Sequence, residues 1–333
     1  MSSPKPVTIY GATGNQGRSV ALSLLRNKAG AFRVRAITRN PDSDSAKALV
    51  AAGAEVVKAD GTDRAQMLAA FEGSWGAFVN TNGDDPALDQ PGGLTEVDIG
   101  KIILDAAADA GVKHIVYSGM ASATEVTGGK YSAPPFDRKN AIGNYASSKS
   151  AFETTTIVSP GNYMENFLIE DLAAIFRGFP YVPDEEGYLT LATPHWGGTE
   201  HVPYIAIEAD YGDLVHGVLL DPVKYNGRFI QGFSQSITSD QVTKDFQEVT
   251  GKKARFVFMS SVDDIQTYGM KALETVKHVF GFSQASGGHY FGTPNDVERA
   301  AELKRLAAEA QGKQGDETKL LTVKQFWKDH FAS

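Results

Sequence analysis

The chain has 333 residues, more than one hydrophobic core usually supports, so one large domain with a smaller second domain is expected. Its formal net charge of -8 and its lack of clustered Lys and Arg argue against a nucleic-acid-binding surface. The absence of Cys excludes disulfides, thiolate catalysis and Cys-ligated zinc. We expect a cytoplasmic protein, since no signal pattern opens the sequence and no apolar run approaches the ~20 residues that cross a membrane.

In the first half of the chain, short apolar segments alternate with amphipathic ones. Strands are expected at 7–11, 33–39, 54–60, 76–82, 113–119 and 154–161. Helices are expected between them, at 17–27, 45–53, 64–73 and 100–111. This alternation predicts βαβ units and a doubly wound parallel sheet that is covered on both faces, an α/β Rossmann fold.

Beyond residue 164 the pattern changes. Residues 183–204 are turn-rich and loop-like, long enough to form a pocket wall or a lid. A helix and a strand return at 208–222 and 227–233, and the remainder is rich in helical patterns. We expect a Rossmann domain over 1–164, an insertion over 165–201, the last helix and strand of the Rossmann domain over 202–233, and a mainly helical part over 234–333. The insertion and the last part would form a smaller, discontinuous α+β substrate domain.

The segment "VTIYGATGNQG" places Gly11, Gly14 and Gly17 directly after an expected strand and before an expected helix. Gly11 permits a tight turn, Gly14 lets the backbone approach a pyrophosphate, and Gly17 lets the helix pack close to the strand. The helix start then offers free N–H groups to phosphate. Dinucleotide binding is therefore expected, with a purely structural turn as the alternative. The expected cofactor residues of this turn are Gly11, Thr13, Gly14, Asn15, Gln16 and Gly17.

The end of the second expected strand indicates which dinucleotide is bound. Thr38 and Arg39 occupy the position where NAD enzymes usually present a carboxylate to the ribose. A guanidinium can bind a 2′-phosphate at two points, so NADP(H) is the expected cofactor. Asp42 and Asp44 nearby are a mild argument against this, and the alternative is that Arg39 only covers a solvated strand end.

Several segments along the sequence, taken together, are specific for one protein family. The chain resembles the NmrA-like atypical short-chain dehydrogenase/reductases, which are related to isoflavone-reductase-like enzymes. The resemblance extends over nearly the whole chain, through "IYGATGNQG", "RAITRNP", "VVKADGTD", "HIVYSGMAS", "FDRK", "IVSPGNYMENF" and "DYGDLVHGVLLDPVKYNG". It implies that Asp60, Asn80 and Thr81 lie near the adenine side and that Pro160, Gly161, Asn162 and Tyr163 lie beside the nicotinamide. The alternative for these residues is that they form ordinary turns at strand ends.

Two lysines compete for the catalytic position. Tyr145 and Lys149 in "NYASSKSAF" have the Tyr-x-x-x-Lys spacing of short-chain dehydrogenases, and Lys139 lies ten residues earlier. In a doubly wound sheet the ligand lies beyond the carboxyl ends of the strands, where the crossover helix begins. Only four residues separate Lys149 from the next expected strand, so it lies at the far end of the helix. Lys139, expected in the first turn and ~15 Å away along the axis, is predicted to face the cofactor. The family's "FDRK" segment implies the same position.

Several groups are candidates for the source of a proton. Pro135 stands four residues before Lys139, where ordinary short-chain dehydrogenases carry their Tyr. The proton would come from Lys139 itself, as the resemblance suggests, or from Tyr163, Tyr131, Ser122 or water. Lys139 and Tyr163 are our catalytic candidates, with the alternative that Lys139 only orients ribose hydroxyls.

Other polar residues are given structural interpretations. His195 and His201 are expected to be solvated loop residues, and no His spacing predicts a metal site. Asp210 is expected to cap a helix.

The sequence as a whole predicts an NADP(H)-dependent oxidoreductase that transfers hydride to or from a small organic carbonyl, imine or activated alkene. Two alternatives stay open. One is a non-catalytic NADP(H)-sensing regulator with a protein partner, which Pro135 favours. The other is an enzyme that uses the cofactor as a scaffold for isomerisation or cyclisation.

Overall fold

The structure is a computed structural model that describes residues 3–85, 88 and 90–332. Within these residues, seven strands form one parallel sheet in the order β10-β6-β5-β4-β1-β2-β3. The strands are β1 (Lys5–Tyr10), β2 (Phe32–Thr38), β3 (Glu55–Lys58), β4 (Gly76–Val79), β5 (His114–Tyr117), β6 (Thr154–Pro160) and β10 (Phe229–Gly232). The order reverses between β1 and β4, which creates a crevice beyond their carboxyl ends.

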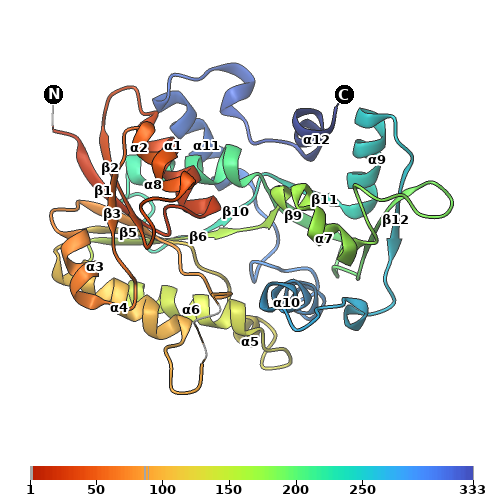
Figure 1. The fold of residues 1–333 in the computed structure, drawn as a ribbon, viewed down its shortest axis with the longest axis horizontal. Helices are drawn as coiled ribbons and strands as arrows, with labels where there is room; N and C mark the ends of the chain where they lie inside the picture. Colours follow the sequence, from red (N-terminus) through yellow and green to blue (C-terminus); the bar gives the residue numbers. More distant parts are fainter. Residues whose placement is uncertain (1–2, 86–87, 89, 333) are drawn as a thin grey trace.

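Helices cover both faces of the sheet (Figure 1). One face carries α1 (Asn15–Leu25), α2 (Asp44–Ala51), α8 (Gly212–Leu220) and α11 (Glu298–Ala310). The other carries α3 (Arg64–Phe71), α4 (Glu96–Asp109) and α6 (Pro134–Ser148), with the short α5 (Ala123–Val126) before α6. The central strands β4 and β5 are buried throughout, as strands covered on both sides must be. The predicted doubly wound Rossmann fold is confirmed.

The second lobe lies beyond the carboxyl ends of the strands, on the right of Figure 1. Its small sheets join β7 (Asn162–Tyr163), β9 (His201–Ile205) and β11 (Gln235–Thr238), and pair β8 (Leu189–Thr193) with β12 (Ala254–Phe258). Its helices are α7 (Glu170–Ala173), α9 (Ser239–Thr250), α10 (Lys271–Ala285) and α12 (Val323–Phe331). The segment 183–204, expected as a loop, therefore contains two strands, because β8 pairs with a strand more than sixty residues later.

The expected domain boundaries stay a prediction. One helix of the last expected segment nevertheless lies on the Rossmann side. In α11, Ala300 and Leu303 are fully buried in the cluster formed by β1, α1 and α8. A Cβ on Gly217 of α8 would come within 2.6 Å of the Leu303 carbonyl oxygen, so α8 and α11 are in close backbone contact. None of the helices within the described ranges combines the length and the apolar content that crossing a bilayer requires.

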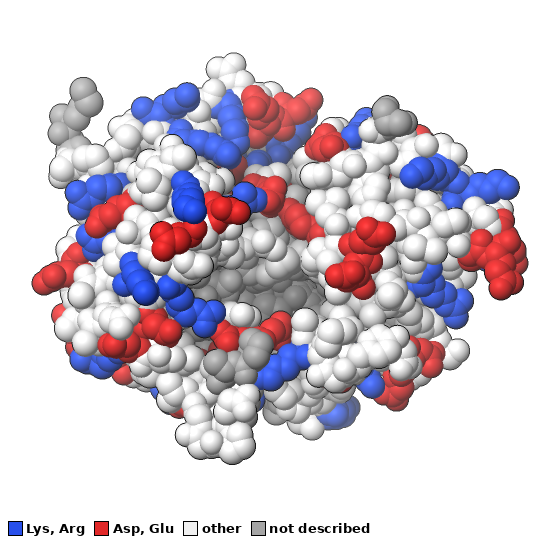
Figure 2. All heavy atoms as spheres, in the orientation of Figure 1, with Lys and Arg blue, Asp and Glu red and all other residues white. Residues whose placement is uncertain are grey.

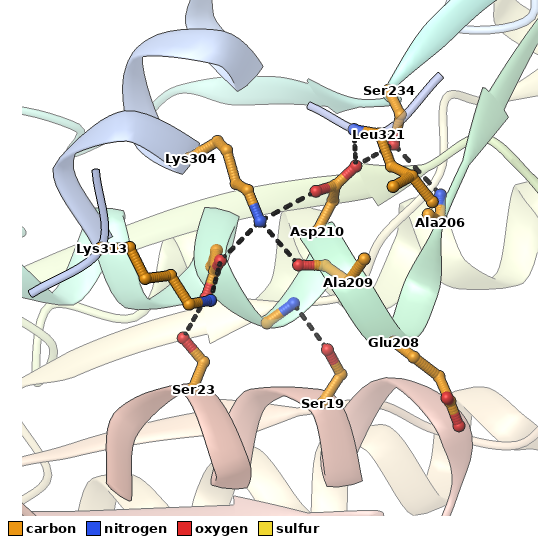
Figure 3. A network of polar contacts seen from close by, with 12 residues as sticks. Ser19, Ser23, Ala206, Glu208, Ala209, Asp210, Ser234, Lys304, Lys313 and Leu321 are labelled. Atoms are coloured by element: carbon orange, nitrogen blue, oxygen red, sulfur yellow. Dashed lines mark hydrogen bonds and ion pairs between the residues drawn. The ribbon is translucent and has the colours of Figure 1, made fainter. Parts of the chain in front are cut away.

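A buried polar cluster fixes α11 to α8 (Figure 3). Lys304 Nζ lies 3.0 Å from Asp210 Oδ1 and 2.8 Å from Asp213 Oδ2, and it donates to the Ala209 carbonyl oxygen at 2.8 Å. All three charged side chains are at most 5% exposed. Burial by itself lowers the pKa of Lys304, but the two carboxylates together raise it above its ordinary value.

The expectation that Asp210 caps a helix is wrong. Asp210 lies in a single π-helical turn, Ile207–Tyr211, and α8 begins after it without a side-chain cap. Its carboxylate accepts hydrogen bonds from Ser234 Oγ at 2.6 Å and from the Leu321 N–H at 2.8 Å. Both donors belong to segments that enter the second lobe, so Asp210 fastens that lobe to the Rossmann part (Figure 3).

Candidate active site

The glycine-rich turn has the geometry that its sequence predicts. Gly11 has φ +78°, and a Cβ there would lie 2.9 Å from the Asn80 carbonyl oxygen. A Cβ on Gly17 would lie 2.2 Å from the Gly11 carbonyl oxygen, so α1 packs against the turn at a distance that excludes any other residue. α1 begins at Asn15, after the N-cap residue Gly14, without a side-chain cap and with no acidic residue in its first turn. Its N-terminal amides are therefore suited to an anion.

A cavity of about 1000 Å³ runs from this turn to the second lobe. Figure 2 shows the hollow at the junction of the two lobes. With the exception of Gly17, the cavity brings together all of the predicted site residues: Gly11, Thr13, Gly14, Asn15, Gln16, Arg39, Asp60, Asn80, Thr81, Lys139, Pro160, Asn162 and Tyr163. Gly17 serves the packing of α1 instead. Cofactor contacts of the individual residues stay predictions.

Lys139 lies on the cavity near the start of α6, in the second helical turn rather than the first, because the helix already begins at Pro134. Its Nζ donates to the Thr81 carbonyl oxygen at 2.6 Å and lies 3.1 Å from Glu96 Oε1. The side chain is 18% exposed, while that of Glu96 is 1% exposed. The ammonium is thus held at the carboxyl end of β4, facing the cavity.

Tyr145 and Lys149 are placed away from the cavity. Lys149 is the C-terminal cap residue of α6, and its Nζ lies 2.5 Å from Asp105 Oδ1. The Tyr145 hydroxyl donates to the same oxygen at 2.7 Å, and its ring packs on the cluster that contains Ile142 and Ala146. Neither residue lines the cavity. The Tyr-x-x-x-Lys spacing here belongs to a structural ion pair between α4 and α6.

Tyr163 lines the cavity next to the first turn of α1. Gln16 Nε2 donates to its hydroxyl, so the phenol hydrogen is available to another acceptor. Burial raises the pKa of Tyr163 to about 12, although the hydrogen bond from Gln16 acts in the opposite direction. At neutral pH this group is a hydrogen-bond donor and a weak acid, less suited than an ammonium to give up a proton.

At the other end of the cavity, Arg39 is 64% exposed and donates to Asp85 Oδ2 at 2.8 Å. Asp60 follows β3, and its Oδ1 accepts from the Thr62 N–H and hydroxyl, both at 2.9 Å. Nearby, burial and the charge of Asp60 raise the pKa of Tyr10 to about 12. These residues form the polar end of the cavity.

Sequence reasoning missed two parts of the site. Glu96 appears in the sequence only as an acidic residue at a helix start, yet its carboxylate is buried and paired with Lys139. It accepts from Thr81 Oγ1 at 2.6 Å. The apolar face of α10 supplies Ala272, Val276, Val279 and Phe280 to the cavity wall. The sequence predicts a mainly helical part over 234–333, but no pattern in it indicates which surface α10 covers.

The His residues of the second lobe take no part in the cavity. His195 is 57% exposed and contacts Glu200, while His201 contacts Thr199 at the start of β9. Within the described residues, no group of three or more His, Asp or Glu is placed to hold a metal ion.

The NmrA-like family model matches residues 3–310. The chain belongs to the NmrA-like family. An NmrA-like family domain-containing oxidoreductase of Cladobotryum sp, FrzB, is 51% identical over 332 residues, covering 98% of each chain. Two solved structures share the fold. NmrA, a negative transcriptional regulator in complex with NADP, has a TM-score of 0.74 at 22% identity and covers 99% of this chain and 96% of its own. The triphenylmethane reductase of Citrobacter sp., complexed with NADP(H), has a TM-score of 0.70 at 21% identity, with 97% and 99% covered.

Proposed function

We propose that this NmrA-like protein is an NADP(H)-dependent oxidoreductase that transfers hydride to or from a small organic carbonyl, imine or activated alkene. Curated relatives that match along almost the whole chain are named oxidoreductases, and the chain is assigned to that class of enzyme. The observation that carries the proposal is the cavity, in which the glycine-rich turn, Lys139 and an apolar wall meet.

The residues of this cavity fit a dinucleotide. The uncapped start of α1 suits a pyrophosphate, and Gln16 Oε1 and Asn162 Nδ2 are buried polar atoms without a hydrogen-bond partner in the described part of the chain. Gly11, Gly14 and Arg39 would hold the phosphates, while Asn162 and Tyr163 would lie beside the nicotinamide. When bound, the nicotinamide supplies or accepts the hydride.

Lys139 would serve as the proton donor at Nζ. Its contacts with the Thr81 carbonyl oxygen and with Glu96 fix the ammonium at the cavity surface. Tyr163 would hold a substrate or ribose oxygen through its hydroxyl. Pro135 lines the cavity beside Lys139, so the position of the usual catalytic Tyr carries no acid in this chain.

A regulator that only senses NADP(H) would not need a substrate cleft above the nicotinamide position. Here Tyr163, Phe167 and residues from the 185–202 segment, including Leu191 and Trp196, line the part of the cavity in which a substrate beside the nicotinamide would lie. The open cavity therefore favours an enzyme with an organic substrate.

Cofactor choice gives one prediction. Arg39→Ala should weaken NADP binding by ~1.5 to 3 kcal/mol, the scale of a charge-assisted hydrogen bond, and leave NAD binding nearly unchanged. The effect should fall at the lower end, because Asp85 already engages the guanidinium. Calorimetric titration with both cofactors measures it. Arg33→Ala, at the opposite end of β2, is the matched control. Equal affinity of the unmutated protein for NAD and NADP would refute the assignment.

Turnover tests the activity itself. NADPH oxidation, followed by absorbance, is measured with panels of carbonyls, imines and conjugated enones. The proposal expects turnover with at least one class. If no class reacts while NADPH and NADP differ tenfold in their effect on binding of a partner protein, the regulator interpretation is the better one.

A further inference from the structure

Carboxylates outnumber cations at the polar end of the cavity. Arg39 follows β2, Asp60 follows β3, and Asp85 belongs to the loop between β4 and α4. Among the described residues that line the cavity, Lys139 is the only other cation, and it is paired with Glu96. A phosphate monoester carries about −1.5 to −2 charges at neutral pH. The 2′-phosphate of NADP would therefore be attracted by one guanidinium and repelled by the carboxylates around it.

Asp85 already binds the guanidinium of Arg39. Arg39 Nη1 donates to Asp85 Oδ2 at 2.8 Å, and the Asp85 side chain is 19% exposed. A guanidinium has five N–H donors, and this one makes no other hydrogen bond within the described residues. A phosphate can thus approach Arg39 either beside Asp85 or in its place. In the first case two anions share one cation, and in the second the ion pair must break, so both lower the affinity for NADP.

The neighbouring carboxylate, Asp84, interacts with the other end of the cavity. Its Oδ1 accepts from Thr275 Oγ1 of α10 at 2.9 Å. Burial raises the pKa of Tyr10, at the polar end, to about 12, and the charge of Asp85 contributes to this shift. Burial also raises the pKa of Tyr163 to about 12, and there the charge of Asp84 contributes instead. Two successive carboxylates therefore act on different ends of one cavity.

We propose that Asp85 is a specificity-determining residue for the cofactor, because its carboxylate repels the 2′-phosphate of NADP and does not oppose the binding of NAD. The inference rests on the proposed function, since it concerns the cofactor of the same site. NAD carries a hydroxyl at this position, which has no charge to repel and can donate a hydrogen bond to a carboxylate. Asp85 thereby limits the preference for NADP that Arg39 creates.

The opposite effect would follow if Asp85 mainly oriented Arg39 for the phosphate. Arg39 is 64% exposed, and an ion pair at such a site contributes little to holding a side chain in one geometry. Repulsion between a carboxylate and a phosphate, in contrast, acts over the whole Debye length. We therefore expect repulsion to outweigh orientation.

The test measures cofactor binding by calorimetry, so it needs no substrate. Asp85→Asn keeps the size of the side chain and removes its charge. It should strengthen the binding of NADP about tenfold and change that of NAD by less than about twofold, since only the phosphate is charged at this position. Asp84→Asn is the matched control. It removes the neighbouring charge, which is bonded to α10, and should strengthen NADP binding by less than about threefold.

Two further measurements separate repulsion from orientation. The gain in Asp85→Asn should shrink between about 0.1 M and about 1 M salt, because the Debye length falls from about 10 Å to about 3 Å. Asp85→Asn should also strengthen NADP binding in the Arg39→Ala background, where no guanidinium remains to be oriented.

Weaker or unchanged NADP binding in Asp85→Asn would overturn the inference. So would an equal gain with NAD or in Asp84→Asn, a gain that does not shrink with salt, or one that is lost in the Arg39→Ala background. Failure of NADP to bind the unmutated protein would overturn it as well. If the binding results are as expected while NADPH oxidation fails with every substrate class, the role of Asp85 stands and the proposed redox function fails.

Discussion

Lys139→Ala should lower turnover by at least ~10²-fold, the usual scale for the loss of a general acid. The ammonium is the charged donor that α6 presents to the cavity beside the Thr81 carbonyl oxygen, and Tyr163, with a pKa near 12, is a poor substitute. Steady-state kinetics and calorimetric binding of NADPH separate the two roles of this lysine. A loss of turnover with cofactor affinity retained identifies a proton donor, and weaker cofactor binding alone identifies a ribose clamp.

Two controls accompany this variant. Lys149→Ala removes a lysine of similar exposure from the same helix but outside the cavity, so it should change turnover little. Because Lys139→Ala leaves the buried carboxylate of Glu96 unpaired, Lys139→Met combined with Glu96→Gln removes both charges and should also be inactive. If Lys149→Ala were the more damaging change, the assignment of the two lysines would be reversed.

Lys304→Met should lower the free energy of unfolding by ~3 to 5 kcal/mol, the cost of leaving a buried carboxylate without its cation. The methionine fills a similar volume, so the loss reports mainly the charge. Asp210 would lose its ion pair with Lys304, while Asp213 would keep only Lys313, whose Nζ lies 3.8 Å from its Oδ2. Urea unfolding followed by circular dichroism measures the change.

Lys319→Met is the matched control for this prediction. Lys319 pairs with Asp316 at 2.7 Å, but its side chain is 73% exposed, so its removal should leave the unfolding midpoint nearly unchanged. Equal midpoints for the Lys304 and Lys319 variants would show that the cluster in Figure 3 contributes little to stability.

The Rossmann half was predictable because its signals are local. Alternating strand and helix patterns, with glycines between β1 and α1, specify a doubly wound sheet from short stretches of sequence. The position of Lys139 followed from the direction of α6 relative to the strands, and it required no knowledge of the second lobe. Only the helix boundary was predicted wrongly, because α6 begins one turn earlier than the sequence analysis expects.

The second lobe was less predictable because its contacts join distant residues. β8 pairs with β12 across more than sixty residues, so its segment looks like a loop when read alone. Asp210 looks like a helix cap, and its actual partner, Lys304, lies far along the chain. Glu96 and Trp196 become recognisable as site residues only once the fold brings Lys139 and α10 to the same cavity.

Isotope labelling tests the proposed redox function by following the hydride itself. NADPH deuterated at the nicotinamide carbon that carries the hydride is incubated with the protein and a substrate from the responding class, and the product is examined by mass spectrometry. Hydride transfer from NADPH predicts one deuterium in each product molecule and one NADP formed for each. A product without deuterium, formed while NADPH stays reduced, would contradict hydride transfer and assign the bound cofactor to a scaffold role.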